Sequence, residues 1–363
     1  MKNLFYFFSV SFLKYQLANK LFAFLTLLSL SLPQQSCNTI DPTDDIKPGR
    51  RDYVWTVDTL NGLNSPRFRM WGSSPTNIWT TTSSNWENSI SHFDGSHWSS
   101  FGVPGIIQPI AIYGFSNTEV YFGEAGSGRI WKYDGYNWIQ FAQLTKDGHN
   151  NIWIENIWGQ SPSNFYAFGA YPDSNGLANG SVISHYNNGN WVNINGDELK
   201  GVVEHFYINR SDNKKYLALI RVGGAEFIDS SIIYEYINNG FNKIFSSLES
   251  KGTKADIALI NNEVIFVLGN QIARRTNNQF HTILNVTNPN FYQRIWGRNT
   301  KDIFLLMTDG LAHYNGTDVE YLFYFNRTPS TQIYGASLFE KDVFFLVDEA
   351  PSGLSLVYHG RLE

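Results

Sequence analysis

Three histidines occupy the same place in a repeated pattern, and their imidazole rings are the first groups that could do chemistry. His92, His185 and His313 each precede the aromatic residue of a strand-like segment, in SHFDG, SHYNNG and AHYNG. Imidazole nitrogens hold zinc when three or four ligands converge on one ion. Here each ring belongs to a different repeat, and Lys132 and Glu235 take the same place in two others. The pattern favours a role on the strand surface, and we expect no metal site and no cofactor.

Motifs of known enzymes give no catalytic set. SHFDGSHW and WKYDGYNW are similar to the Asp-box of sialidases, but Asp94-Gly95 and Asp134-Gly135 are adjacent, whereas the box places one residue between Asp and Gly. A sialidase also needs an arginine triad and a Tyr/Glu pair, for which the sequence offers no convincing set. The chain has no P-loop, no G-x-S-x-G and no H-E-x-x-H. No catalytic residue is predicted.

Aromatic and acidic side chains gather in four turn-rich segments, TTTSSNWENS, GEAGSG, GAYPDSNGLANGS and RVGGAEFIDSS. The candidate ligand-binding residues in these segments are Trp86, Glu87, Glu124, Tyr171, Asp173, Glu226 and Asp229. Aromatic rings stack on sugar rings, and carboxylates accept hydrogen bonds from hydroxyl groups. The alternative is that these residues are solvated loop tips. Whether they form one site depends on the elements that position them.

Those elements repeat along the chain with a period of about 40 to 45 residues, a spacing typical of propeller blades. Five aromatic-glycine pairs open repeats: Trp71-Gly72, Tyr113-Gly114, Trp158-Gly159, Trp296-Gly297 and Tyr334-Gly335. Two degenerate copies fit the long gap, at 205 to 220 and at 256 to 269. Each repeat continues with a second strand, a variable loop, a third strand ending in an Asp-Gly or Asn-Gly turn, and a fourth strand. We therefore predict an all-β fold, a seven-bladed β-propeller of four-stranded antiparallel blades.

The stretch YVWTVDTL before the first repeat predicts how the ring closes. After residue 69 there are seven first strands but six fourth strands, and the last repeat stops at residue 363 after its third strand. Residues 51 to 60 should therefore pair with residues 354 to 361 as the outer strand of the last blade. Such pairing would leave no unpaired edge between the two ends of the chain.

The N-terminus reads as an export signal. Three lysines precede the apolar run LFAFLTLLSLSL at 21 to 32, and Cys37 follows as the only cysteine, which excludes a disulfide within the chain. Cys37 resembles the lipidated cysteine of bacterial lipoproteins, although Gln34 and Gln35 stand where that signal has small or aliphatic residues. The alternatives are an ordinary secretory signal and an uncleaved anchor. We predict a signal peptide at 1–36, a lipidated Cys37 with a flexible tether at 37–50, and the propeller at 51–363.

The repeats MWGSSPTNIW with HFDGSHW and IWGQSPSNFY with SHYNNG resemble those of bacterial secreted seven-bladed propellers, many of them lipoproteins. The resemblance covers residues 51 to 363 and implies a binding or scaffold module. We expect a non-enzymatic module of the bacterial envelope, attached to the outer membrane through the lipid anchor alone, that recognises a protein or carbohydrate ligand through loops on one propeller face. The alternative is a polysaccharide-acting enzyme, a glycoside hydrolase or lyase, with its site on the same face. The formal net charge of −5 and the lack of a basic stripe argue against nucleic acid.

Overall fold

A computed structural model describes residues 46–60, 67–82, 86–174, 176–178, 180–221, 230–248, 253–326, 331–349 and 352–363. The chain divides into two units, Met1–Asp45 and Ile46–Glu363, and all the described residues belong to the second. The predicted signal peptide and Cys37 lie outside the described residues. Among the residues described, no helix has the length and apolar character needed to cross a membrane.

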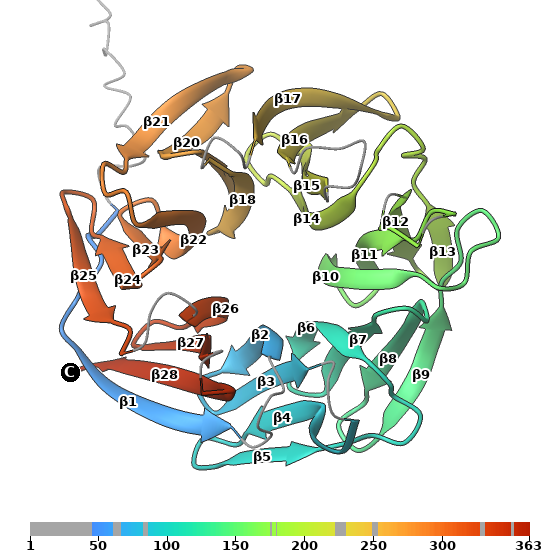
Figure 1. Ribbon diagram of the computed structural model, residues 1–363, viewed down its shortest axis with the longest axis horizontal. Helices are drawn as coiled ribbons and strands as arrows, with labels where there is room; N and C mark the ends of the chain where they lie inside the picture. Colours follow the sequence, from blue (N-terminus) through green and yellow to red (C-terminus); the bar gives the residue numbers. More distant parts are fainter. Residues whose placement is uncertain are drawn as a thin grey trace, which may run out of the picture. The chain divides into compact units, whose positions relative to one another are not determined.

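The described strands form seven antiparallel sheets of four strands each, arranged as the blades of a ring (Figure 1). The first blade is β2 (Arg67–Ser74), β3 (Asn77–Thr82), β4 (Ile90–Phe93) and β5 (Trp98–Phe101). The second is β6 (Pro109–Ser116), β7 (Glu119–Glu124), β8 (Arg129–Tyr133) and β9 (Trp138–Gln143). The third is β10 (Trp153–Ser161), β11 (Asn164–Tyr171), β12 (Gly180–Asn187) and β13 (Asn190–Asn193). The prediction of an all-β, seven-bladed propeller is confirmed.

The remaining blades follow the same order along the chain. The fourth is β14 (Val202–Ile208), β15 (Lys215–Arg221), β16 (Ser230–Ile237) and β17 (Gly240–Leu248). The fifth is β18 (Ala255–Ile260), β19 (Glu263–Leu268), β20 (Gln271–Thr276) and β21 (Gln279–Asn285). The sixth is β22 (Phe291–Asn299), β23 (Asp302–Met307), β24 (Gly310–Tyr314) and β25 (Val319–Tyr324). The seventh is β26 (Thr331–Leu338), β27 (Asp342–Glu349), β28 (Leu354–Leu362) and β1 (Tyr53–Leu60).

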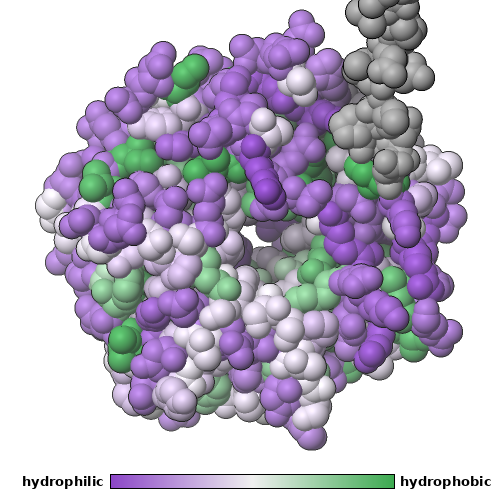
Figure 2. All heavy atoms as spheres, turned by 180° about the vertical axis from the view of Figure 1, so that it is seen from behind, coloured by the Kyte–Doolittle hydropathy of each residue, from purple (hydrophilic) through white to green (hydrophobic). Residues whose placement is uncertain are grey.

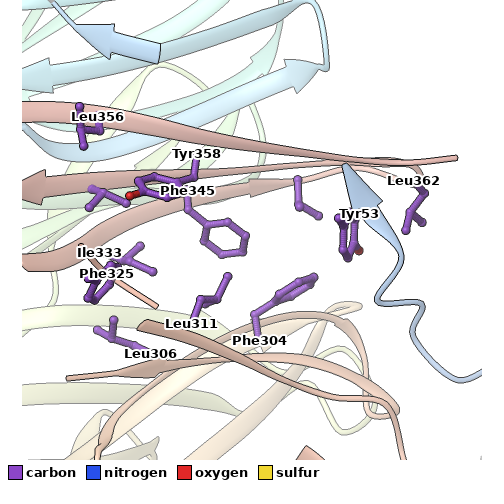
Figure 3. Packing of buried hydrophobic residues seen from close by; sticks show 12 residues of the cluster. Tyr53, Phe304, Leu306, Leu311, Phe325, Ile333, Phe345, Leu356, Tyr358 and Leu362 are labelled. Atoms are coloured by element: carbon purple, nitrogen blue, oxygen red, sulfur yellow. The ribbon is translucent and has the colours of Figure 1, made fainter. Parts of the chain in front are cut away.

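The first strand of each repeat lies innermost, and contacts between neighbouring inner strands run round the ring back to β2 from β26. Apolar side chains fill the space between adjacent blades. Figure 3 shows one such layer between the sixth and seventh blades, where Phe304 of β23 packs against Phe345 of β27 with ring centroids 5.3 Å apart. Burial of this kind is the main stabilising contribution in a fold with no disulfide.

The Asp-Gly segments build the hairpin turns between third and fourth strands. The Asp94 carboxylate accepts hydrogen bonds from the amides of Ser96 and His97, both at 2.8 Å, and Gly95 adopts a positive φ of 99°. These amide hydrogen bonds lower the pKa of Asp94 to about 2. Asp134 makes the same turn in the next blade. These aspartates therefore stabilise the hairpin turns.

The N-terminal strand β1 pairs with β28 as the outer strand of the seventh blade. The antiparallel register runs from Tyr53 opposite Leu362 to Leu60 opposite Ser355. Tyr53 and Leu60 are buried, and Figure 3 shows Tyr53 beside the apolar layer between the last two blades. Leu60, on the opposite face from Tyr53, packs with Met70 and Ile78 of the first blade, whereas Val54 and Val57 are 51% and 50% exposed. The strand therefore contributes apolar side chains to the layers on both of its faces.

Candidate functional site

The recurring histidines lie within their own blades. The ring of His92 stacks on Trp79 with centroids 3.9 Å apart, and its Nε2 lies 2.6 Å from Oδ1 of Asn77. His185 repeats this arrangement, and His313 pairs with a carboxylate and an aromatic ring at the same places of its blade. Each ring thus joins the second and third strands of one sheet. The predicted strand-surface role matches these contacts.

The predicted loop residues are described only in part. Glu226 and Asp229 lie outside the described residues, as does the side chain of Trp86. The short 3₁₀ helix η1 (Trp86–Asn88) carries Glu87 on its surface, and the Glu87 side chain is exposed.

Glu124 does not lie exposed on the loop face as expected. Its side chain is fully buried at the end of β7. The carboxylate accepts hydrogen bonds from the Ile107 amide at 2.8 Å, from Nε of Arg129 at 2.7 Å and from Nε1 of Trp131 at 3.2 Å. A buried carboxylate with these partners stabilises its loop, because burial is tolerated only when charge and lone pairs are satisfied. The expectation that Glu124 is exposed in its loop is therefore wrong.

The side chains of Tyr171 and Asp173 also make contacts within and beside their own loop. The Tyr171 ring lies over Gly180, its cross-strand partner, where an added Cβ would come within 2.2 Å of the ring. It also contacts the His149 ring at a centroid distance of 4.6 Å. Oδ1 of Asp173 accepts a hydrogen bond from the Leu177 amide at 3.0 Å. Tyr171 is therefore half-buried packing rather than a free aromatic tip.

The inner strands carry an irregularity that the sequence did not reveal. In the first, second, third and sixth blades the register between the first and second strands shifts shortly before the aromatic-glycine pair, and the fourth and seventh blades also have a shift between these strands. In β14 the shift falls between Val203 and His205, which leaves Glu204 as the extra residue. Successive strand residues normally point to opposite faces, but a bulge re-aims one of them. Glu204 and His205 can therefore reach the same group of charges.

That group, called here the channel cluster, comes from the inner strands of five blades. Its members are Arg69, Glu155, Glu204, His205, Asp256 and Arg294. Nη2 of Arg69 lies 2.5 Å from Oε1 of Glu155. Arg294 is shared, with Nη2 at 3.5 Å from Glu204 and Nε at 3.6 Å from Asp256. Side-chain exposures of 11% to 26% show that the cluster is enclosed but reached by solvent.

His205 is held neutral inside this cluster. Its Nδ1 lies 3.0 Å from the Tyr207 hydroxyl, and its Nε2 lies 3.5 Å from Oδ1 of Asp256. Burial lowers the pKa of His205 to about 3, which outweighs the opposing effect of Glu204. An uncharged imidazole keeps one nitrogen lone pair available as an acceptor.

The carboxylates of the cluster are less well compensated than their partners. Burial raises the pKa of Glu155 and of Asp256, against the lowering effects of Arg69 on the first and of Arg294 on the second. Burial acts to lower the pKa of Arg294, but the charges of Glu204 and Asp256 outweigh it and the pKa is raised. The environment of the cluster therefore stabilises the charged form of Arg294 more than the charged forms of Glu155 and Asp256.

A central cavity of about 360 Å³ adjoins these groups and is lined by all seven inner strands. Figure 2 shows the hollow at the centre of the ring, viewed from behind. Charged or polar lining comes from Arg69, Asn156, His205, Asp256 and Arg294, and aromatic lining from Trp71, Tyr113, Trp158, Tyr207, Trp296 and Tyr334. This size lies at the lower end for small-molecule sites.

The cluster lies toward the face that bears the long loops. Its residues stand near the beginnings of the inner strands, and the register places those beginnings beside the ends of the second strands. In the third blade, Trp153 at the start of β10 pairs with Ala170, one residue before β11 ends. The loops between second and third strands leave from that edge.

Glu204, His205 and Asp256 could also hold a metal ion, since one ligand atom from each lies within 4.8 Å of the others. The guanidinium of Arg294 already contacts both carboxylates. A divalent ion there would be placed next to a fixed positive charge, which opposes its binding.

One feature of the sequence could have indicated part of the channel cluster. In several blades the residue two places before the aromatic residue of the inner strand is polar, as at Arg69, Asn156, His205 and Arg294. Polar residues at an innermost position of a propeller require an explanation, because buried strands are otherwise apolar. Glu155, Glu204 and Asp256 gave no comparable signal.

Comparisons with known proteins support the fold. No protein-family model matches the chain, and no curated protein matches it. Among solved structures, virginiamycin B lyase from Staphylococcus aureus aligns with a TM-score of 0.61 at 13% identity, over 86% of this chain and 100% of that one. YCF48 bound to D1 peptide aligns at 0.58 and 14% identity, over 86% and 99%. The extracellular domain of the putative one component system BT4673 from B. thetaiotaomicron aligns at 0.56 and 14% identity, over 84% of this chain and 40% of that one. At such identities the likeness concerns the fold alone.

Proposed function

We propose that this chain is a non-enzymatic binding module of the bacterial cell envelope. It takes a protein or glycan ligand at the loop-bearing face, at the mouth of the central channel. The observation that carries the proposal is the channel cluster, a set of charged groups from five blades, of which Arg69, His205, Asp256 and Arg294 line the central cavity. Buried charge costs stability unless it is fully compensated, so a cluster left partly compensated is explained by a ligand that completes it.

Two further points support export and binding. The N-terminal sequence has the order of a signal peptide followed by a cysteine and a polar tether. Propellers of similar fold include an extracellular domain and a protein bound to a peptide. The outer-membrane lipoprotein form, with Cys37 as the anchor, is part of the proposal.

The geometry favours binding over catalysis. His205 is neutral with a strongly lowered pKa, so it does not act as a general base that exchanges protons near neutral pH. Arg294 contacts both Glu204 and Asp256, so the two carboxylates share one positive partner. A general acid and base pair requires two groups whose environments separate their pKa values.

One observation favours the enzymatic alternative, a glycoside hydrolase or lyase. Oxygen atoms of Glu204 and Asp256 lie within 4.8 Å of one another, and burial raises the pKa of Asp256. Retaining glycosidases hold their two carboxyl groups about 5 Å apart, with one pKa raised. The same two residues therefore serve to test both functions.

The test combines affinity capture from envelope extracts, a glycan array and a hydrolysis assay on envelope polysaccharides, all with residues 46–363. Binding that Glu204→Gln weakens, without turnover, is expected. The matched control is Glu340→Gln, an exposed acid away from the cluster. Turnover that Glu204→Gln and Asp256→Asn abolish would establish the enzyme instead. Trp86→Ala tests the loop face: retained binding would restrict recognition to the channel.

A further inference from the structure

We propose that the mouth of the central channel binds one organic cation, a primary ammonium or a guanidinium group, as on the lysine or arginine side chain of a protein partner. This inference rests on the proposed function and specifies the chemistry of its ligand. Four features of the described residues carry it: net charge, incomplete pairing, acceptor spacing and aromatic lining.

The first feature is the net charge of the channel cluster. Glu155, Glu204 and Asp256 carry three negative charges when ionised, and Arg69 and Arg294 carry two positive charges, with His205 neutral. Lys254 stands nearby, and its ammonium contacts the Tyr292 hydroxyl at 3.1 Å. With all three carboxylates ionised, the six groups of the cluster are therefore one positive charge short of neutrality.

The pairing within the cluster is uneven. Arg69 and Glu155 form a tight pair at 2.5 Å, whereas one guanidinium serves both Glu204 and Asp256 at 3.5 and 3.6 Å. Charge-assisted hydrogen bonds ordinarily measure about 2.7 to 2.9 Å. Among the described residues, Arg294 is the hydrogen-bond partner that the Glu204 carboxylate has. Glu204 thus keeps lone pairs for a further donor.

The spacing of the acceptors suits a donor with several N–H groups. Atoms of Glu204, His205 and Asp256 all lie within 4.8 Å of one another, and Nε2 of His205 is 3.5 Å from Oδ1 of Asp256. Acceptors this close can share one donor nitrogen, since three acceptors about 2.9 Å from an ideal tetrahedral ammonium stand about 4.7 Å apart. The neutral imidazole acts as an acceptor through Nε2 when its Nδ1–H donates to the Tyr207 oxygen, a pair 3.0 Å apart. The bulge at Glu204 brings two of the three acceptors from one strand.

The walls of the cavity suit the stem of a long basic side chain. The aromatic residues Trp71, Tyr113, Trp158, Tyr207, Trp296 and Tyr334 line the channel beside the charges. Methylene groups pack on such rings, while the charged end reaches the carboxylates. The chain already contains one such contact at this end of β18, where the Lys254 ammonium lies 4.2 Å from the Tyr292 ring centroid.

Calorimetric titration of the purified full-length protein tests the inference. The probes are acetyl-Gly-Lys-Gly-amide and acetyl-Gly-Arg-Gly-amide, with norleucine and citrulline peptides as uncharged counterparts. We expect a basic peptide to bind at least about tenfold more tightly than its counterpart, and Glu204→Gln and Asp256→Asn each to weaken it by about tenfold or more. Glu340→Gln should leave the affinity unchanged. Thermal melts of each variant confirm that the domain is folded.

Further arms distinguish the sources of the cation and the competing explanations. Butylammonium or ethylguanidinium binding as tightly as the peptides would identify a free amine or guanidine ligand, and tighter peptide binding would identify a protein side chain; both outcomes support the cation site. Equal affinity for charged and uncharged peptides overturns it. So does binding of zinc chloride that Glu204→Gln removes while the amines have no effect. If the Glu204→Gln variant still captures the same partners, the cation site is rejected, but the proposal of a binding module is retained.

Discussion

Trp55 provides the sharpest test of how the N-terminal strand contributes to the domain. Its ring packs inward, 4.9 Å from the ring centroid of Phe323 and 5.5 Å from that of Tyr53. It also covers Gly360, where an added Cβ would come within 2.9 Å of the indole. Two residues along, Val57 lies on the same face of the strand but is 50% exposed. The pair Trp55→Ala and Val57→Ala therefore compares a packed position with an exposed position on one face of the strand.

The expected magnitudes follow from burial. A buried tryptophan removes roughly 150 to 250 Å² from water at about 25 cal/mol per Å², and aromatic pairs add about 1 kcal/mol. Because the Trp55 side chain is partly buried, Trp55→Ala should lower the free energy of unfolding by about 3 kcal/mol. For a domain of this size that corresponds to about 5 °C in Tm. Val57→Ala should cost less than about 0.5 kcal/mol.

Urea unfolding followed by tryptophan fluorescence and circular dichroism measures both variants against the parent. Deleting residues 51–60 extends the test, since it exposes the β28 edge and should cause aggregation or loss of cooperative melting. Equal effects of Trp55→Ala and Val57→Ala would refute the inward packing of β1. A deletion variant that melts like the parent would show that the ring does not need this strand.

Three further predictions concern the loop, the anchor and the channel. Glu124→Gln should destabilise the domain by about 3 kcal/mol in urea unfolding, because it leaves the Arg129 guanidinium without its buried counter-charge; an unchanged midpoint would refute the role of this pair. Cys37→Ala should move the protein from the membrane to the soluble fraction, and unchanged detergent partitioning would refute lipidation. The His205 pKa is lowered on folding, so the unfolded chain binds the extra proton and stability should fall as pH drops from about 6.5 toward 3, by at most about 1.4 kcal/mol per unit. His205→Asn should flatten that dependence relative to the exposed control His97→Asn, and identical slopes would contradict the neutral imidazole.

The fold could be read from the sequence because each blade repeats its own local signals. Asp94-Gly95 marks a tight turn, and its amide hydrogen bonds and positive φ are local properties of a few residues. The stack of His92 on Trp79 recurs in other blades, so the repeat itself indicated a structural role. Such signals need no knowledge of distant parts of the chain.

The candidate site could not be read in the same way. Glu124 ends a strand and opens a glycine-rich turn, so composition placed it at a loop tip, whereas Arg129 and Trp131 enclose its carboxylate. In the channel cluster, Glu204 contacts Arg294, which lies ninety residues later in the sequence. The contact depends on the β-bulge in β14, and the alternation of apolar and polar residues does not reveal where a strand has a bulge.

The asymmetry of the inner ring is the strongest physical indication of where function lies. Contacts required by the fold recur from blade to blade, as the histidine stacks and aspartate turns do. The channel cluster does not recur: β2 and β22 supply arginines, β10, β14 and β18 supply carboxylates, and β6 lines the cavity with Ile112 and Tyr113. A propeller needs no charge at these positions, and enclosed charge costs stability. A feature that breaks the sevenfold repeat at such a cost is best explained by recognition of a ligand that is itself asymmetric and positively charged.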